Sequence, residues 1–197
     1  AQVWSVVMAS NRTPWVFRFA GQPTWVVPDD EGRPVATILN EERLRHMLAR
    51  LARWVRENAK GDLMPAPPPV ATVKSVLATP DPALPVLTGI VNTPVFGRSG
   101  TLITAPGYHP DARLLYVPAP GFTVPDIPKR PTEAEIAAAR ELICDDLFGD
   151  FPFTGEAERA HVVALLLLGF LRGMVDGPTP LHLIEKPTPG TGATLMV

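Results

Sequence analysis

The sequence predicts an α+β fold in which short strands come first and helices come last. Three observations indicate this: short apolar runs separated by turn residues near the N-terminus, one regular amphipathic pattern after them, and two helix-like stretches in the last third. With 197 residues, 46% of them hydrophobic, the chain is long enough to bury a core. Its 24 prolines cluster at 64–70, 79–85 and 116–131, where regular structure must stop, and so divide the chain into sections.

Residues 1–62 are predicted to form a small α/β unit. Strand-like runs at 3–8, 15–19, 24–27 and 34–39 are separated by turn signals. The stretch "EERLRHMLARLARWVRENAK" at 41–60 is predicted to be one helix, with Asn40 as its N-cap and Gly61 as its stop. At helical spacing its leucines share one face, and the opposite face is basic, formed by Arg43, Arg45, Arg50, Arg53, Arg56 and Lys60.

The following sections alternate between linker, strands and helices. Residues 63–85 are predicted to be a proline-rich linker with a short helix at 70–78, and residues 86–130 a β-meander with a hairpin turn at "GRSG". Residues 131–197 are predicted to hold two helices. The first has Thr132 and Glu135 at capping-box spacing, and the second, at about 156–175, contains the apolar run 162–171 and is expected to be buried. "LHLI" at 181–184 is predicted to be a short buried strand that leads into a glycine-rich loop.

The loop "PTPGTGATLMV" is a candidate nucleotide site. Walker A loops read G-x-x-x-x-G-K-[ST], and their backbone amides, lysine and hydroxyl hold phosphates and magnesium. The match places Pro187 at the first glycine, Gly192 at the second, Ala193 at the lysine and Thr194 at the hydroxyl. "PGTG" is typical of AAA+ and helicase-type loops, so the candidate residues are Pro187, Gly190, Thr191, Gly192, Ala193 and Thr194. An unrelated turn stays the alternative, and without the lysine or an acidic Walker B strand we expect no hydrolysis and no catalytic residue.

Several segments together resemble a known family. "LPVLTGIVNTPVF", "GTLITAPGYHPDARLLY", "PTEAEIAAARELICDDLFGDFPF", "AERAHVVALLLLGFLR" and "PLHLIEKPTPGTGATLMV" resemble the region before the ATPase core in helicase-like and primase-helicase-like P-loop proteins of bacteriophages and mobile elements. The resemblance covers residues 84–197 well and 1–60 loosely. It implies a whole protein that uses ATP and magnesium and works on DNA, with other segments of the ATPase or replication proteins as partners. It also implies a lysine where Ala193 stands, so this chain departs from the pattern.

The charge distribution restricts how DNA could be bound. A formal net charge of −2 gives no basic footprint over the whole chain, so binding would depend on the basic helix face. The alternative is a solvated face on an Arg-rich protein, since the chain has 14 Arg and 4 Lys. Trp15, Trp25 and Trp54 are candidates for base stacking, but core positions are favoured for them.

The remaining polar residues predict no catalytic or metal site. His109 and Asp111 lack a nucleophile beside them, so a turn is favoured over a catalytic pair. The histidines and Cys144 show no metal-ligand spacing, and a solvated cluster is favoured over a magnesium site for Asp145, Asp146 and Asp150. One cysteine, no secretory leader and no apolar run of transmembrane length predict a cytoplasmic protein without membrane contact.

The predicted function is that of an accessory N-terminal region of a phage-like replicative helicase ATPase, with DNA as its possible partner and an incomplete nucleotide site. The alternative is a non-enzymatic protein interaction module whose glycine-rich loop is only a turn. A third hypothesis is a self-sufficient nucleotide-binding protein.

Overall fold

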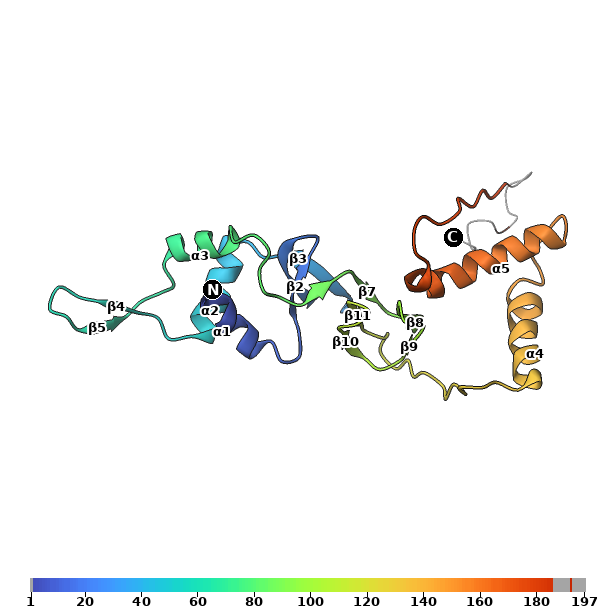
Figure 1. Ribbon diagram of the computed structural model, residues 1–197, viewed down its shortest axis with the longest axis horizontal. Helices are drawn as coiled ribbons and strands as arrows, with labels where there is room; N and C mark the ends of the chain where they lie inside the picture. The colour runs from blue at the N-terminus through green and yellow to red at the C-terminus, as the bar shows by residue number, and fades with distance from the viewer. Residues whose placement is uncertain (1, 186–191, 193–197) are drawn as a thin grey trace. The chain divides into compact units, whose positions relative to one another are not determined.

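The computed structural model describes residues 2–185 and 192 and confirms a mixed α+β fold. The chain divides into two compact units, which are described separately. The first unit comprises residues 1–93 and 105–120, and the second comprises residues 94–104 and 121–197. Figure 1 shows the helices and strands of each unit along the chain.

The first unit is built on a four-stranded sheet in the order β3-β2-β1-β6. Strands β1 (Val16–Phe19), β2 (Gln22–Pro28) and β3 (Pro34–Ile38) lie where the sequence predicts strands and are antiparallel neighbours, and β6 (Val86–Leu87) pairs in parallel with β1. Ala20 and Gly21, with φ of 48° and 80°, form the two-residue turn between β1 and β2. This geometry matches the right-handed twist of the two strands.

Three helices form the core of this unit with the sheet. Helix α1 spans Gln2–Ser10, α2 spans Glu41–Leu51 and α3 spans Val70–Leu77. The core cluster contains side chains from every one of these helices and from β1: Trp4, Val7, Val16, Leu39, Leu44, Met47, Leu48, Val73, Val76 and Leu84. The prediction of a strand at 3–8 is wrong. Its apolar residues recur at helical spacing, which puts Trp4 and Val7 in the core from one helix face.

Helix α2 is shorter than predicted, and this is the main correction in the first unit. The Asn40 side chain accepts the amide of Arg43 at 2.9 Å and caps the helix as expected. However, the helix ends at Leu51, and the chain then forms a hairpin of β4 (Val55–Glu57) and β5 (Leu63–Pro65). Both the Ala52 amide and the Trp54 indole N–H donate to the Leu48 carbonyl. Residues that follow the helix therefore satisfy this carbonyl of its last turn.

The strands between 86 and 117 are present, but their pairing differs from that of a simple meander. In the first unit, β10 (Gly107–His109) pairs with β11 (Leu114–Tyr116), and β11 pairs in parallel with β7 (Gly89–Val91). Strands β8 (Val95–Phe96) and β9 (Leu102–Ile103) form a separate hairpin in the second unit, and the predicted "GRSG" turn joins them.

The second unit contains the two predicted helices. Helix α4 (Glu133–Glu141) has the predicted capping box between Thr132 and Glu135 and continues as the π-helix η1 (Leu142–Leu147). Helix α5 (Glu156–Leu171) is followed by the short 3-10 helix η2 (Arg172–Met174). The expectation that the apolar run of α5 is buried is wrong, because no residue of α5 is buried in the described structure. No helix within the described ranges is long and apolar enough to cross a membrane.

Candidate nucleic-acid interface

The basic residues assigned to one helix face lie on three successive elements. Helix α2 carries Arg43, Arg45 and Arg50, whereas Arg53 precedes β4, Arg56 lies on β4 and Lys60 lies in the hairpin turn. The prediction of a single helical face is therefore wrong for the last three residues. The reason is the early end of α2 at Leu51.

Arg43 and Arg45 are engaged with the fold. The guanidinium carbon of Arg43 lies 5.4 Å from the centroid of the Trp25 ring, which is a cation–π distance. The Arg45 Nε donates to the Pro68 carbonyl at 2.9 Å, and its half-buried side chain lines a shallow groove together with the carboxylates of Glu41 and Glu42. Both arginines therefore hold α2 against neighbouring segments.

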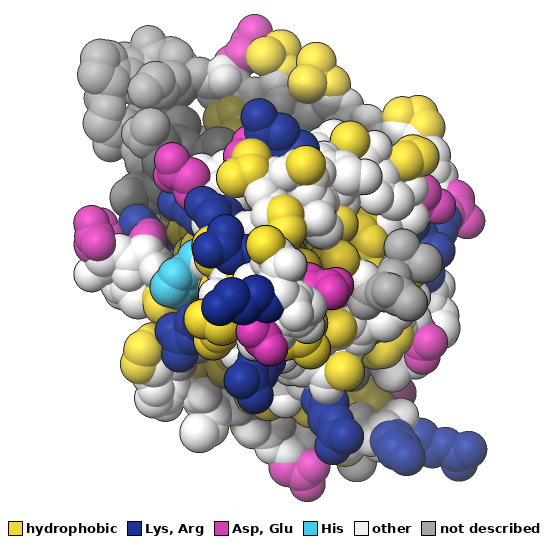
Figure 2. All heavy atoms as spheres, turned by 90° about the vertical axis from the view of Figure 1, so that its left-hand side faces the viewer, with side chains coloured by type: hydrophobic (Ala, Val, Ile, Leu, Met, Phe, Trp, Pro, Cys, Tyr) yellow, Lys and Arg dark blue, Asp and Glu magenta, His cyan; other side chains and the backbone are white. Residues whose placement is uncertain are grey.

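The other four cations are free. Arg50, Arg53, Arg56 and Lys60 are exposed, and their side chains form no ion pair or hydrogen bond with any residue that the structure describes. Elsewhere five cations have acidic partners: Arg18 with Asp81, Arg33 with Asp29 and Glu31, Lys74 with Glu41, Arg98 with Asp176, and Arg159 with Asp145. Arg12, Lys129, Arg130 and Arg140 also have no side-chain partner among the described residues, so what distinguishes the four is that they lie within one short segment. Figure 2 shows Lys and Arg side chains gathered on the face that carries the end of α2 and the β4–β5 hairpin. We call Arg50, Arg53, Arg56 and Lys60 the basic surface.

The acidic residues beside the basic surface are few. Between residues 50 and 62, two carboxylates, Glu57 and Asp62, accompany the four cations. The Asp62 carboxylate accepts from the Asn58 side-chain amide at 3.1 Å, within the hairpin turn. The segment therefore keeps an excess of two positive charges in a chain of net charge −2, and this excess is the local patch that phosphate binding requires.

The tryptophans support the core interpretation rather than a stacking platform. The rings of Trp15 and Trp25 are 6.5 Å apart and pack, together with Trp54, against the core cluster of the first unit. The indole of Trp54 is also fixed by its 2.9 Å hydrogen bond to Leu48. All three are at least partly buried, so none offers a free ring face on the basic surface.

The candidate nucleotide loop falls mostly outside the described residues. This applies to Pro187, Gly190, Thr191, Ala193 and Thr194, whereas Gly192 is described. Gly192 has φ of +79°, and a Cβ there would lie 3.1 Å from the Phe151 ring, so both conformation and space favour glycine. These features fit a turn as well as a phosphate loop.

The strand predicted before this loop is not formed. Residues 181–184 have no regular secondary structure, and Leu181 and Leu183 are 96% and 80% exposed. In the described part of the second unit, the paired strands are β8 and β9, and they pair with each other. The segment therefore has no described sheet to join.

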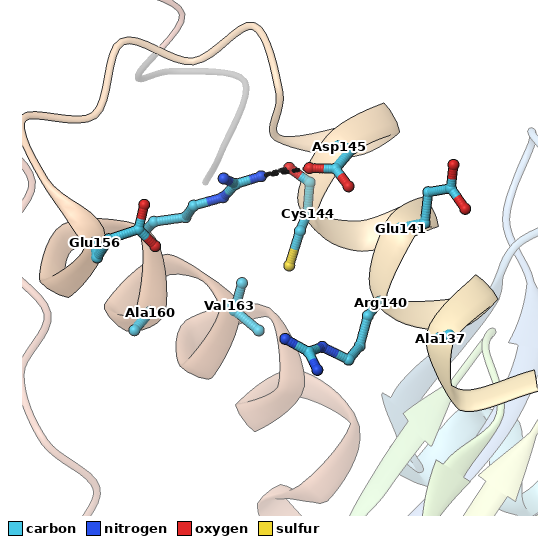
Figure 3. A pocket seen from close by; sticks show the side chains of 9 residues that line it. Ala137, Arg140, Glu141, Cys144, Asp145, Glu156, Ala160 and Val163 are labelled. Carbon is cyan, nitrogen blue, oxygen red and sulfur yellow. Dashed lines mark hydrogen bonds and ion pairs between the residues drawn. The ribbon is translucent and has the colours of Figure 1, made fainter. Parts of the chain in front are cut away.

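A second hollow lies between α4–η1 and α5 (Figure 3). Nη2 of Arg159, on α5, donates to the Asp145 carboxylate at 2.9 Å and to the Cys144 carbonyl, which links the two helices. The side chains of Cys144 and Arg140 point into the hollow. No histidine lines it to act as a base for the thiol, so its ion pair is explained as a link between helices.

The other polar residues show structural roles. His109 lies at the end of strand β10 rather than in the turn that the sequence predicts, and its Nε2 lies 2.7 Å from the Ala105 carbonyl. Among residues 2–185 and 192, no group of three or more His, Cys, Asp or Glu side chains is placed to hold a metal ion.

No protein-family model, no curated protein and no solved structure matches this chain.

Proposed function

We propose that this chain is a DNA-contacting accessory region of a helicase-type P-loop ATPase, of the kind found in bacteriophages and mobile elements. The observation that carries the DNA contact is the basic surface: four exposed cations within eleven residues, none with an acidic partner in the described structure. Cations left unpaired by their own fold are available to phosphates, and each contact releases condensed counterions. Such a region would hold DNA beside the motor, in the cytoplasm.

The test is fluorescence anisotropy with labelled DNA over a salt series. Four phosphate contacts give a slope of about −3.6 in log affinity against log salt, so affinity falls on the order of 100-fold between 50 and 200 mM. The variant Arg50→Glu/Arg53→Glu should weaken binding on the order of 100-fold or more at 50 mM. Lys129→Glu/Arg130→Glu is the matched control, since it makes the same charge change at exposed residues of the second unit.

Two results would contradict the proposed DNA contact. Equal losses in both variants would show an effect of net charge and exclude the basic surface as a site. Absence of binding at 50 mM salt to both single-stranded and double-stranded DNA would remove the DNA contact altogether.

The ATPase part of the proposal rests on the loop and on the segment before it. Leu181 and Leu183 are large apolar residues with almost full exposure, as expected of a strand whose sheet lies in another part of an ATPase core. The loop itself does not fit hydrolysis, because Ala193 supplies no cation for the β- and γ-phosphates. We therefore derive no step through ATP or magnesium. In a longer reading frame, this proposal requires an acidic Walker B strand after residue 197, and a continuation without one would refute it.

The second candidate is a protein interaction module, and the helices of the second unit favour it. Helices α4 and α5 have no buried residue among those described, and large apolar side chains are exposed on α5, η1 and η2: Leu142, Leu147, Leu167, Phe170 and Met174. In the helicase proposal the ATPase core would bury these side chains, whereas in this candidate another protein would bury them. The anisotropy experiment separates the two, since a pure interaction module shows no salt-dependent DNA binding.

A further inference from the structure

The hairpin that carries half of the basic surface is an ordered arm; we call β4–β5 with its turn (residues 55–65) the arm. The Asn58 side-chain oxygen accepts the amides of Lys60 and Asp62 at 2.8 and 3.0 Å, and the Asn58 amide donates to the Asp62 carbonyl at 2.9 Å. Gly61 has φ of +87°, which favours glycine and closes the turn. These contacts stabilise the tip in this turn conformation.

The base of the arm is tied to the core of the first unit. The Ala66 amide donates to the Trp54 carbonyl at 3.0 Å, directly below the last cross-strand pair. Trp54 packs against the core cluster and donates to Leu48 on α2. The arm consequently projects from a fixed point beside the end of α2, as Figure 1 shows.

Neither face of the arm is covered in the described structure. All six strand residues are exposed, including Val55, Leu63 and Met64 at 44%, 68% and 48%. A two-stranded ribbon with uncovered faces is marginally stable in water, so its apolar side chains gain by contact with a partner. Because no other element packs on its edges or faces in the described structure, the arm is a single two-stranded β-ribbon. The major groove of B-DNA is wide enough to admit a ribbon of this kind.

The charges of the arm are arranged along its length. Arg53 lies just before the arm, Arg56 in its middle and Lys60 at its tip; within the arm Glu57 and Asp62 balance the two cations, so Arg53 supplies the positive excess at its base. A three-residue strand spans about 10 Å. Cross-strand pairing puts Arg56 beside Met64 on one face and Glu57 beside Leu63 on the other. Cations spread over this length suit the phosphates at the groove edges, whereas apolar side chains suit thymine methyl groups and a carboxylate suits the cytosine amino group.

We infer that the arm enters the major groove of duplex DNA, with Arg53, Arg56 and Lys60 on the phosphates and Leu63 and Met64 against base edges. This inference rests on the proposed DNA contact and names its form. Duplex is favoured over single-stranded DNA because residues 55–65 contain no aromatic side chain, and binders of single strands stack bases on aromatic rings. The nearest ring, Trp54, is held against the core.

The experiment compares a labelled duplex with its single strand, using the full chain and the variant Leu63→Ser/Met64→Ser. We expect duplex affinity to fall about ten-fold with an unchanged salt slope, because base-edge contacts are lost and phosphate contacts are kept. The matched control is Val35→Ser/Ile38→Ser, which removes exposed apolar side chains from β3 and should leave affinity unchanged. A minor-groove ligand added in excess should not displace the protein.

A second variant covers the case in which the serine variant loses its fold. Lys60→Ala changes one exposed side chain at the tip and leaves the turn hydrogen bonds in place, because these use the Lys60 backbone amide. It should lower the salt slope by about 0.9 and weaken duplex binding about eight-fold at 0.1 M salt. Circular dichroism and thermal melting verify that each variant is folded.

The outcomes separate this inference from the proposed function. If Arg50→Glu/Arg53→Glu abolishes binding while Leu63→Ser/Met64→Ser binds duplex like the wild type, the groove contact is overturned and the DNA contact stands. Equal losses for duplex and single strand, or displacement by the minor-groove ligand, would also overturn it. No binding to any DNA at 50 mM salt would instead remove the proposed function.

Discussion

The structure divides the six candidate DNA-binding residues into two classes, and neutralising them one at a time should reveal the division. Arg50, Arg53, Arg56 and Lys60 have no partner among the described residues, whereas Arg43 lies over Trp25 and Arg45 donates to a backbone carbonyl. A helical face of six equivalent cations, as the sequence predicts, would have no such division.

The magnitude follows from counting the free cations. Each phosphate contact contributes about 0.9 to the slope of log affinity against log salt, so four contacts give about −3.6 and six would give about −5.4. Replacing one free cation with alanine should change the slope by about 0.9 and weaken binding about eight-fold at 0.1 M salt. Replacing Arg43 or Arg45 should change the slope by less than half as much, because leaving its present contacts offsets a phosphate contact.

Fluorescence anisotropy at five or more salt concentrations measures each slope, with Arg33→Ala as the control, since that exposed arginine is paired with Asp29 and Glu31. Equal slope changes for Arg43→Ala and Arg50→Ala would refute the division. A wild-type slope close to −5.4 would do the same.

Three further predictions concern the fold and the loop. Asn11→Ala should lower the free energy of unfolding in urea by about 3–6 kcal/mol, because this buried side chain makes three hydrogen bonds to the backbone of Trp15 and Val16. A loss below about 1 kcal/mol would contradict this. The Thr132 backbone amide holds the pKa of Glu135 below its usual 4.5, so this carboxylate stabilises α4 above that pH and the effect is lost as pH falls through the lowered pKa. Glu135→Gln should therefore lower helicity by circular dichroism at pH 7 and not in strong acid, and a deficit that persists in strong acid would count against the charged cap. With Ala193 at the lysine position, millimolar MgATP should leave the melting temperature unchanged, and a saturable rise would show a functional site.

Local signals in the sequence were sufficient where short-range chemistry determines the structure. The caps at Asn40 and Thr132 and the turn between β8 and β9 were found because a capping side chain or a tight turn acts within a few residues. The mixed fold class followed from the same local patterns. The parallel pairings of β6 with β1 and of β11 with β7 join distant segments, and no local pattern indicates them.

The end of α2 shows how a strong helical pattern conceals a hairpin. Leu51, Trp54 and Val55 continue the apolar face of the helix, so periodicity favoured one helix to residue 60. The signal for the alternative was the cluster of turn residues from Asn58 to Asp62, which includes Gly61. With that turn formed, Trp54 packs against the core as it would on a longer helix, whereas Arg56 and Lys60 lie on the arm instead of on a helix. The turn thus decides which basic residues project from the fold.

The opposite error occurred at residues 181–184, where a strand pattern lacks a sheet. A buried strand of a parallel sheet satisfies its amides and carbonyls only through neighbouring strands, and the described second unit offers only β8 and β9, which are already paired with each other. The same absence of partners explains why the apolar run of α5 is half-exposed rather than buried. Under the proposed function one further layer would account for both deviations, because a sheet that received Leu181 and Leu183 would also offer a surface to α5. A partner that supplies such a layer should therefore protect α5 and residues 181–184 together in hydrogen exchange. Protection of one without the other would separate the two features and remove this argument for a P-loop core.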